Sequence, residues 1–249
     1  QKPEVRIDGV VEIMSKDLGL MAKLLQIVNS AFFGLSSEVK NLKHAVTLLG
    51  LDLVRTLALA SGVFNRFPVD GMGYLTADWL ADHGAAVGRR AKRIADALGL
   101  EESTSDMAML AGLLHDTGKL IQLAFFRDKI QAAGSLAIKK ELPLHLAEQT
   151  LSGVDHSRVG AHLLALWGLP NKLVEAVAFH HEPLQAGEAR LGVLAAVHMA
   201  DAFIWEDYAE RPRPLRPGGG SLDLDYMAAL GINEGRLAEL REQAIIAPL

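Results

Sequence analysis

The sequence predicts an all-α protein built as a helical bundle, on three observations. Apolar residues recur three and four positions apart along most of the chain, which is typical of helices with one buried face. Good helix-capping residues stand before these apolar segments, and glycine or proline stands between them. No segment shows the alternation of apolar and polar residues that is typical of a half-buried strand. We therefore expect helices nearly throughout.

The first part of the chain predicts a helical lobe of its own. Three helices are expected here, at residues 18–28, 41–50 and 52–64. Asp17 and Asn41 can cap the first two, and Gly50 can end the second. The Pro- and Gly-rich stretch of residues 68–74 then separates this part from the rest. We expect residues 1–72 to form an N-terminal helical lobe.

The following residues, 73–209, predict a second helical lobe. Thr76 and Ser105 can cap two of its helices, Pro170 suits the first turn of another, and a short apolar stretch ends at Phe126. The helices are expected at about residues 77–98, 107–114, 144–151, 156–167, 170–181 and 191–208.

The end of the chain predicts a different organisation. Residues 209–221 are rich in Pro, Arg and Gly, as linkers and surface loops are. Two short helices are expected after this loop, at residues 223–230 and 233–245. We expect residues 210–249 to form a linker and a C-terminal helical extension.

The composition excludes several classes of protein. A formal net charge of −5 argues against a protein that coats nucleic acid, which needs a basic face. No apolar run is long enough to span a membrane, and no signal peptide is recognisable. The absence of cysteine excludes a disulfide framework and fits a reducing compartment. We expect a soluble cytoplasmic protein and, because it begins with Gln1 rather than Met, a fragment or a processed chain.

Residues 43–64 also fit a helix-turn-helix, with Gly50 at the turn. The second helix offers Arg55 but few other side chains that could contact bases or phosphates, so nucleic acid is not an expected partner. A protein-interaction surface around residues 29–33 is an alternative role for this lobe, although its two phenylalanines are more typical of core anchors.

Histidine and aspartate recur over more than a hundred residues, each time on or beside a predicted helix. A helical bundle could therefore point all of them toward one site. Imidazole and carboxylate together suit a first-row divalent metal, and without cysteine they are the only strong ligands that the chain offers. The candidate metal ligands are His83, His115, Asp116, His156, His180, His181 and Asp201.

Side-chain chemistry suggests roles for three residues in such a site. Asp116 could bridge two ions about 3.5–4 Å apart, which would activate water and hold a phosphoryl group. Lys119, three residues further along, could stabilise charge on that phosphate. Asp155, beside His156, could accept a hydrogen bond that orients the ring of a ligand. We therefore predict a di-metal phosphohydrolase-type site with Asp116 and Lys119 as its candidate catalytic residues.

These residues also have structural interpretations. Buried histidines often only satisfy hydrogen bonds, and Lys119 could equally be a solvated cation at a helix end. His198 lies one turn before Asp201 and could approach the site, although core packing is the favoured interpretation. No function is assigned to the remaining histidines, His44, His145 and His162.

Several longer motifs resemble those of a known family. In the second lobe they are LLHDTGKL, DHSRVGAHLLALWGLP, VEAVAFHHEP and VHMADAF, and in the first they are AKLLQIVNSAFFGL and AVTLLGLDLVRTLAL. Together they resemble the HDOD proteins, an output-domain branch of the HD-domain metal-dependent phosphohydrolases. The resemblance covers roughly residues 10–206, and the first lobe is its more specific part, because ordinary HD hydrolases lack it. It implies an HDOD domain over residues 1–209, with an HD-like core in the second lobe.

The resemblance also implies two groups of metal ligands. HD enzymes hold one ion through positions that match His83, His115, Asp116 and Asp201. The related HD-GYP cyclic-di-GMP phosphodiesterases add three histidines for a second ion, at positions that match His156, His180 and His181, and the lysine of their HDxGK motif matches Lys119. Two departures argue against cyclic-di-GMP hydrolysis: residues 182–192 lack the GYP tripeptide, and Trp79 stands where some of that branch place a glutamate ligand.

Two classes of function therefore remain open. The chain resembles a bacterial signal-transduction output domain of HDOD type, whose metal site, expected to be dinuclear, could hydrolyse a phosphoester, for example in a nucleotide. Alternatively, it is a catalytically inactive regulatory module with a vestigial HD site, whose output is a contact with signalling proteins or regulatory domains. The expected cofactor is one or two divalent transition metal ions (Fe, Mn, Zn, Co or Ni), selected by geometry and availability.

Overall fold

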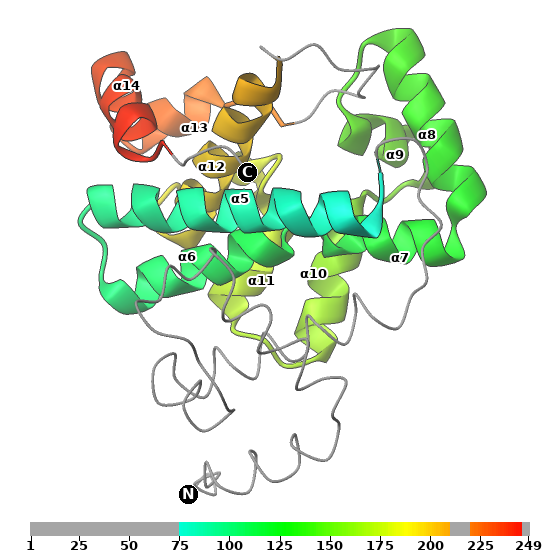
Figure 1. The fold of residues 1–249 in the computed structure, drawn as a ribbon, viewed down its shortest axis with the longest axis horizontal. Coiled ribbons are helices and arrows are strands. Elements are labelled where there is room, and N and C mark those ends of the chain that lie inside the picture. Colours follow the sequence, from blue (N-terminus) through cyan, green and yellow to red (C-terminus); the bar gives the residue numbers. More distant parts are fainter. Residues whose placement is uncertain (1–74, 210–219, 246–249) are drawn as a thin grey trace, which may run out of the picture. The chain divides into compact units, whose positions relative to one another are not determined.

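The computed structural model describes residues 75–209 and 220–245, and most of this part is helical (Figure 1). The all-α fold predicted from the sequence is confirmed. Among the described helices, none combines the length and the apolar character needed to cross a bilayer. The N-terminal lobe predicted at residues 1–72 and most of the loop predicted at residues 209–221 lie outside the described residues. The proposed domain boundaries therefore stay predictions.

The described helices follow one another with mostly short connections. Over residues 77–209 they are α5 (Ala77–Ala97), α6 (Glu102–Leu114), α7 (Thr117–Phe125), α8 (Arg127–Lys140), α9 (Leu144–Ser152), α10 (His156–Leu166), α11 (Asn171–Phe179), the 3-10 helix η1 (Pro183–Ala186) and α12 (Val193–Ala209). Near the end of the chain they are α13 (Leu224–Ala229) and α14 (Glu234–Gln243). Each helix predicted after residue 76 is present, and most bounds differ by only a few residues.

Helix α5 lies along α6 and α12 (Figure 1). It begins where the sequence predicts, because the Thr76 hydroxyl accepts a hydrogen bond from the backbone N–H of Trp79 at 3.0 Å. One face of α5, with Val87, Ala91 and Ile94, is fully buried against its neighbours. Burial of this apolar face fixes α5 within the bundle.

Glycines let α5 and α6 approach closely. A Cβ atom on Gly84 would lie 2.5 Å from the carbonyl oxygen of Leu113, and one on Gly112 would lie 2.7 Å from the backbone of α5. A carbon atom does not tolerate either distance, so the contact requires glycine at both positions. As a result, His83 in α5 lies next to His115 at the end of α6.

The starts of α7 and α10 approach each other even more closely. A Cβ atom on Gly118 would lie 1.8 Å from the carbonyl oxygen of His156 and 2.8 Å from the backbone nitrogen of Gly160. Both neighbours are backbone atoms of α10, which cannot move aside as a flexible side chain can. This contact brings Asp116, just before α7, close to His156, the first residue of α10.

Helix α8 was not predicted from the sequence. Its buried face consists of Ile130, Ala133 and Ala137, so two of its three core positions are alanines with a weak apolar signal. These alanines pack against Leu144 and Ala147 of α9. Packing against α9, rather than the apolar periodicity of its own sequence, therefore stabilises α8.

Two predicted helix starts are displaced. Helix α6 begins at Glu102, and Ser105, predicted as its cap, lies buried inside it. The acidic side chain of Glu102 suits the first turn of a helix, which explains the earlier start. Pro170 stands at the cap position of α11 rather than in the first turn.

The C-terminal helices pack on the same helical core. Tyr226 and Met227 of α13 and Leu240 of α14 are buried. Helix α14 contacts α5, where Arg236 donates a hydrogen bond of 2.6 Å to the carbonyl oxygen of Ala97. The predicted C-terminal extension is therefore integrated with the helices that carry the candidate ligands.

Candidate metal centre

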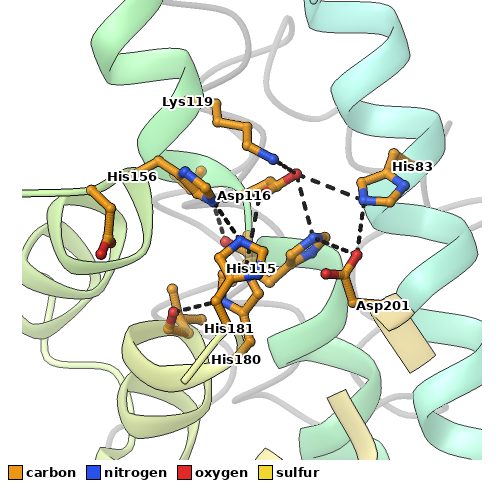
Figure 2. Close-up of polar contacts among 12 residues, drawn as sticks. His83, His115, Asp116, Lys119, His156, His180, His181 and Asp201 are labelled. Atoms are coloured by element: carbon orange, nitrogen blue, oxygen red, sulfur yellow. Dashed lines mark hydrogen bonds and ion pairs between the residues drawn. The ribbon is translucent and has the colours of Figure 1, made fainter. Parts of the chain in front are cut away.

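The structure brings all seven predicted ligand residues together (Figure 2). His83 and Asp201 stand inside α5 and α12, whereas the other five stand at helix ends. Those five are His115 after α6, Asp116 before α7, His156 at the start of α10, and His180 and His181 after α11. His181 is partly buried, and the other six side chains are at most 4% exposed.

His83, His115 and Asp201 form the first group, called here the α5/α12 half. The Nε2 atom of His83 lies 3.2 Å from Oδ1 of Asp201, and Nε2 of His115 lies 3.6 Å from the same oxygen. Atoms that bind one ion at about 2.0–2.2 Å are spaced by about these distances. The three side chains could therefore hold one metal ion.

Asp116, His156, His180 and His181 form the second group, called here the helix-end half. Oδ1 of Asp116 lies 3.3 Å from Nε2 of His156 and 4.0 Å from Nε2 of His180. The Nε2 atoms of His156 and His181 lie 3.0 Å apart. This group too could hold one metal ion.

Asp116 stands between the two halves (Figure 2). Its Oδ1 faces His156, as described above, whereas its Oδ2 lies 3.4 Å from Nε2 of His115 and 3.7 Å from Nε2 of His83. One carboxylate oxygen therefore faces each half. This is the arrangement needed for a carboxylate that bridges two ions.

Backbone carbonyl groups orient two of the histidine rings. Nδ1 of His115 lies 2.7 Å from the carbonyl oxygen of Gly112, and Nδ1 of His180 lies 2.9 Å from that of Val177. A carbonyl can only accept, so each ring carries a proton on Nδ1 and has a lone pair on Nε2 when it is neutral. Both Nε2 lone pairs then face the centre, as metal ligands require.

A carboxylate orients the ring of His156, but it is not the predicted one. Asp155 caps α10 instead, by accepting a hydrogen bond from the backbone N–H of Arg158. The Nδ1 atom of His156 donates to Oε2 of Glu148 at 2.7 Å. Sequence analysis missed Glu148 because it lies in the preceding helix, eight residues before His156. Only the folded arrangement of α9 and α10 reveals the pair.

Both buried acids of the centre are ionised. Burial alone would raise the pKa of Asp116, but His115 and Lys119 outweigh this effect and hold that pKa well below its usual value. Burial would likewise raise the pKa of Asp201, but its contact with His83 and the charge of His115 hold it below the usual value. Two negative charges are therefore present at the centre at neutral pH.

Four histidines of the centre fall into two classes by pKa. Burial lowers the pKa of His180 to about 3 and that of His181 well below its usual value, and neighbouring histidines add to both effects. Burial acts in the same direction on His156, but the Glu148 carboxylate outweighs it and raises the pKa to about 9. Burial is also outweighed at His115, whose pKa is raised. Protons therefore compete with a metal mainly at His156 and His115.

Several buried ligand atoms have no hydrogen-bond partner among the described residues. They are Nε2 of His115, Oδ1 of Asp116, Nε2 of His180 and Oδ1 of Asp201. Buried polar atoms are nearly always paired, so four such atoms around one point require an explanation. A divalent metal would satisfy them, because imidazole nitrogen and carboxylate oxygen are its usual ligands. The donor set therefore fits a metal.

Lys119 is part of the centre rather than a solvated cation (Figure 2). Its side chain is 5% exposed, and Nζ donates to Oδ2 of Asp116 at 2.7 Å. Lys119 lies in the first turn of α7, where the helix dipole disfavours a cation, so the ion pair with Asp116 offsets that cost. The structure excludes the solvated helix-end interpretation.

Two aromatic side chains flank the centre on opposite halves. Trp79 stacks on the ring of His83, with centroids 4.8 Å apart. His145, to which the sequence assigned no function, stacks on His181 at 4.3 Å. The distance along the chain between His145, in α9, and His181 hides this contact from sequence reasoning. His162 is exposed, and His44 lies outside the described residues.

His198 belongs to neither ligand group, but it contacts the backbone of a candidate ligand, His180. Its Nδ1 lies 2.7 Å from the carbonyl oxygen of His180, and its Nε2 accepts from the backbone N–H of Asp223 at 2.9 Å. Close to Asp223, Gly220 approaches the centre so closely that a Cβ atom there would lie 2.8 Å from Oδ2 of Asp201. A residue within the predicted linker therefore forms part of the wall around the centre.

The sequence matches a known family of domains. The family model of the HDOD domain matches residues 1–183. A protein of Treponema pallidum (strain Nichols), named only as uncharacterized, is 27% identical over 210 residues, which are 82% of this chain and 39% of that protein. The chain thus spans about two fifths of the length of this curated relative.

Solved structures share the fold. An HDOD domain protein of unknown function from Geobacter sulfurreducens matches with a TM-score of 0.67 and 24% identity, over 98% of this chain and 87% of that one. A candidate phosphohydrolase from Shewanella amazonensis SB2B matches with a TM-score of 0.64 and 26% identity, over 98% and 89% of the two chains.

Proposed function

The chain belongs to the HDOD domain family, and on this basis we propose that it is a signal-transduction output domain with an HD-type site for two divalent metal ions that hydrolyses a phosphoester. The observation that carries the proposal is the convergence of imidazole and carboxylate groups from five places in the chain, four of whose buried atoms, on His115, Asp116, His180 and Asp201, have no hydrogen-bond partner among the described residues. The name of the Shewanella amazonensis relative, a candidate phosphohydrolase, agrees with it.

The proposed reaction relies on the charges that the side chains provide. Asp116 offers one oxygen to each half, and the acids and neutral imidazoles could hold two ions beside each other. Such ions would supply positive charge to a phosphoryl oxygen and activate water for attack. Lys119, held at 2.7 Å from Asp116, adds a further positive charge that a phosphate could contact.

The proposed substrate is a phosphoester other than cyclic-di-GMP. Residues 182–192 lack the GYP tripeptide, and Trp79 fills the position of the glutamate ligand by stacking on His83. The α5/α12 half therefore has no additional carboxylate from the start of α5. A nucleotide is the substrate class that we propose to test first.

A second candidate function is a regulatory module without catalysis. The burial of the ligands favours it, because six of the seven are at most 4% exposed and only His181 is partly accessible. A metal in such a site would stabilise the fold and leave little room for a substrate. The output would then be a contact with signalling proteins or regulatory domains.

Metal analysis and an activity screen together test the two candidates. Protein purified without chelator is analysed for Fe, Mn, Zn, Co and Ni and assayed on nucleotides, phosphomonoesters and cyclic dinucleotides with added Mn²⁺. The proposal predicts two bound ions per chain and hydrolysis that is lost in Lys119→Met. Bound metal without any hydrolysis would support the regulatory module, and the absence of bound metal would overturn both metal-based functions.

A further inference from the structure

Glu148 is a buried carboxylate outside the predicted ligand set. It lies in α9 and is 2% exposed, with no lysine or arginine paired to it among the described residues. A single oxygen, Oε2, accepts hydrogen bonds from the ring Nδ1 of His156 at 2.7 Å and from the backbone N–H of His156 at 2.9 Å. Burial of a carboxylate costs free energy unless hydrogen bonds compensate for the lost water, and for Glu148 the two bonds from His156 provide this compensation.

The two hydrogen bonds fix the histidine in a particular way. Because one oxygen holds both the ring and the backbone of His156, the ring cannot rotate about its side-chain bonds without losing a contact. Since Nδ1 donates to Glu148, Nε2 is the atom that faces Asp116 at 3.3 Å. Glu148 therefore sets both the direction and the tautomer of this ring.

His156 differs in this respect from the two other oriented histidines. The rings of His115 and His180 donate to neutral backbone carbonyls, whereas His156 donates to a negatively charged group. A carboxylate partner makes an imidazole a stronger electron donor to a metal than a carbonyl partner does. The helix-end half thus contains one candidate ligand, His156, whose bond to a metal Glu148 would strengthen.

Nearby acids do not share this role. Asp155 accepts from the backbone of Arg158 and from the side chain of Gln149, and its contacts hold the start of α10. Glu182 also accepts from Gln149, at 3.0 Å. Among the described acids, only Glu148 contacts the Nδ1 atom of a candidate ligand.

We propose that Glu148 is a positioning residue that holds His156 for the second metal ion, so that the helix-end half depends on Glu148 and the α5/α12 half does not. The inference rests on the proposed function, because it requires a metal at the centre. It extends that function by assigning to one half of the centre a residue outside the ligand set.

Metal titration of four proteins tests the inference. The chelator-treated chain, Glu148→Gln, Glu148→Ala and Asp155→Asn are titrated with Mn²⁺, and the bound ions are counted by calorimetry and located by anomalous diffraction. Glutamine keeps the shape and the acceptor oxygen but removes the charge, so it separates positioning from simple packing. Asp155→Asn is the matched control, because asparagine caps a helix as well as aspartate does.

The expected result is a selective loss. Binding in the helix-end half should weaken about tenfold in Glu148→Gln and up to about 100-fold in Glu148→Ala, the range typical of groups that orient metal ligands. The ion at His83, His115 and Asp201 should bind as before, and Asp155→Asn should match the unmodified chain. If Glu148→Ala does not fold, Glu148→Gln alone decides.

Three negative results are distinguishable. If both Glu148 variants bind the second ion as tightly as the unmodified chain, the role of Glu148 is wrong and the metal site remains. If the unmodified chain binds no ion, the proposed function itself is wrong. Equal weakening in both halves would show a general structural role and would also overturn the inference.

Discussion

The two halves of the centre are built from different parts of helices. In the α5/α12 half, His83 and Asp201 stand inside long helices that pack side by side. In the helix-end half, all four residues stand at helix ends, where the chain turns from one helix to the next. The first half is fully buried, whereas the second contains the partly buried His181.

This difference has a consequence for function. Residues inside packed helices are held by the whole helix, so the fold fixes the positions of His83 and Asp201. Only His115 in this half stands at a helix end, where the Gly112 carbonyl orients its ring. Residues at helix ends need additional contacts, which Glu148, the Val177 carbonyl and His198 supply. We therefore expect the helix-end half to be the more adjustable one and the side from which a substrate or a regulatory signal reaches the centre.

Asp116 belongs to both halves, so its loss should have the largest effect. In Asp116→Ala, we expect neither ion to bind, because each half loses an oxygen. The buried ammonium of Lys119 also loses its partner, which should lower the free energy of unfolding by about 3–5 kcal/mol. Metal analysis and urea unfolding measure the two effects.

The matched control for Asp116→Ala is Asp106→Ala. Asp106 pairs with Lys92 at 2.6 Å, but both side chains of this pair remain partly exposed to solvent. An exposed pair typically contributes about 0–1 kcal/mol, so this variant should keep both ions and nearly all its stability. Retention of one tightly bound ion in Asp116→Ala would show that the halves do not share a bridging carboxylate.

Two glycine substitutions should separate the halves. A methyl group at Gly118 would push α7 away from His156, and one at Gly112 would push α6 away from α5. Each change should lower the free energy of unfolding by about 1–3 kcal/mol, which is typical of overpacking. Gly118→Ala should mainly weaken the ion of the helix-end half, and Gly112→Ala that of the α5/α12 half.

Gly134→Ala is the control for both, because a Cβ atom there would meet nothing within 4 Å. This change in the middle of α8 should stabilise the chain slightly, by about 0.5–1 kcal/mol. Chemical unfolding and Mn²⁺ titration are measured for all three variants. Equal weakening of both ions in Gly118→Ala would mean that the two halves move as one unit.

Much of the α5/α12 half was predictable from the sequence. The apolar spacing around His83, the Thr76 cap and the His-Asp pair after an apolar helix are local signals. They indicated the helices correctly, and they pointed to residues that the structure brings together as candidate ligands. The contacts of Glu148 and His145 were not predictable, because they depend on how α9 packs beside α10 and His181. The start of α6 predicted at Ser105 was wrong, because a good capping residue can also lie inside a helix when packing buries it.

Proton binding should make the stability of the metal-free chain depend on pH, through groups in and beside the helix-end half. Burial lowers the pKa of His145 to about 4 from 6.5, so the unfolded chain binds this proton more readily and stability should be lost as pH falls from about 6.5 toward 4. At His156, where Glu148 outweighs burial and raises the pKa to about 9, the stabilising contribution is fully present below about 6.5 and should be lost as pH rises toward 9.

Urea unfolding in chelator at several pH values measures both losses of stability, the acid limb below pH 6.5 and the basic limb above it. His145→Asn should flatten the acid limb alone, whereas the exposed control His162→Asn should leave the profile unchanged. An acid limb that persists unchanged in His145→Asn would assign it to the other buried histidines whose pKa values burial lowers, which are His83, His180, His181 and His198.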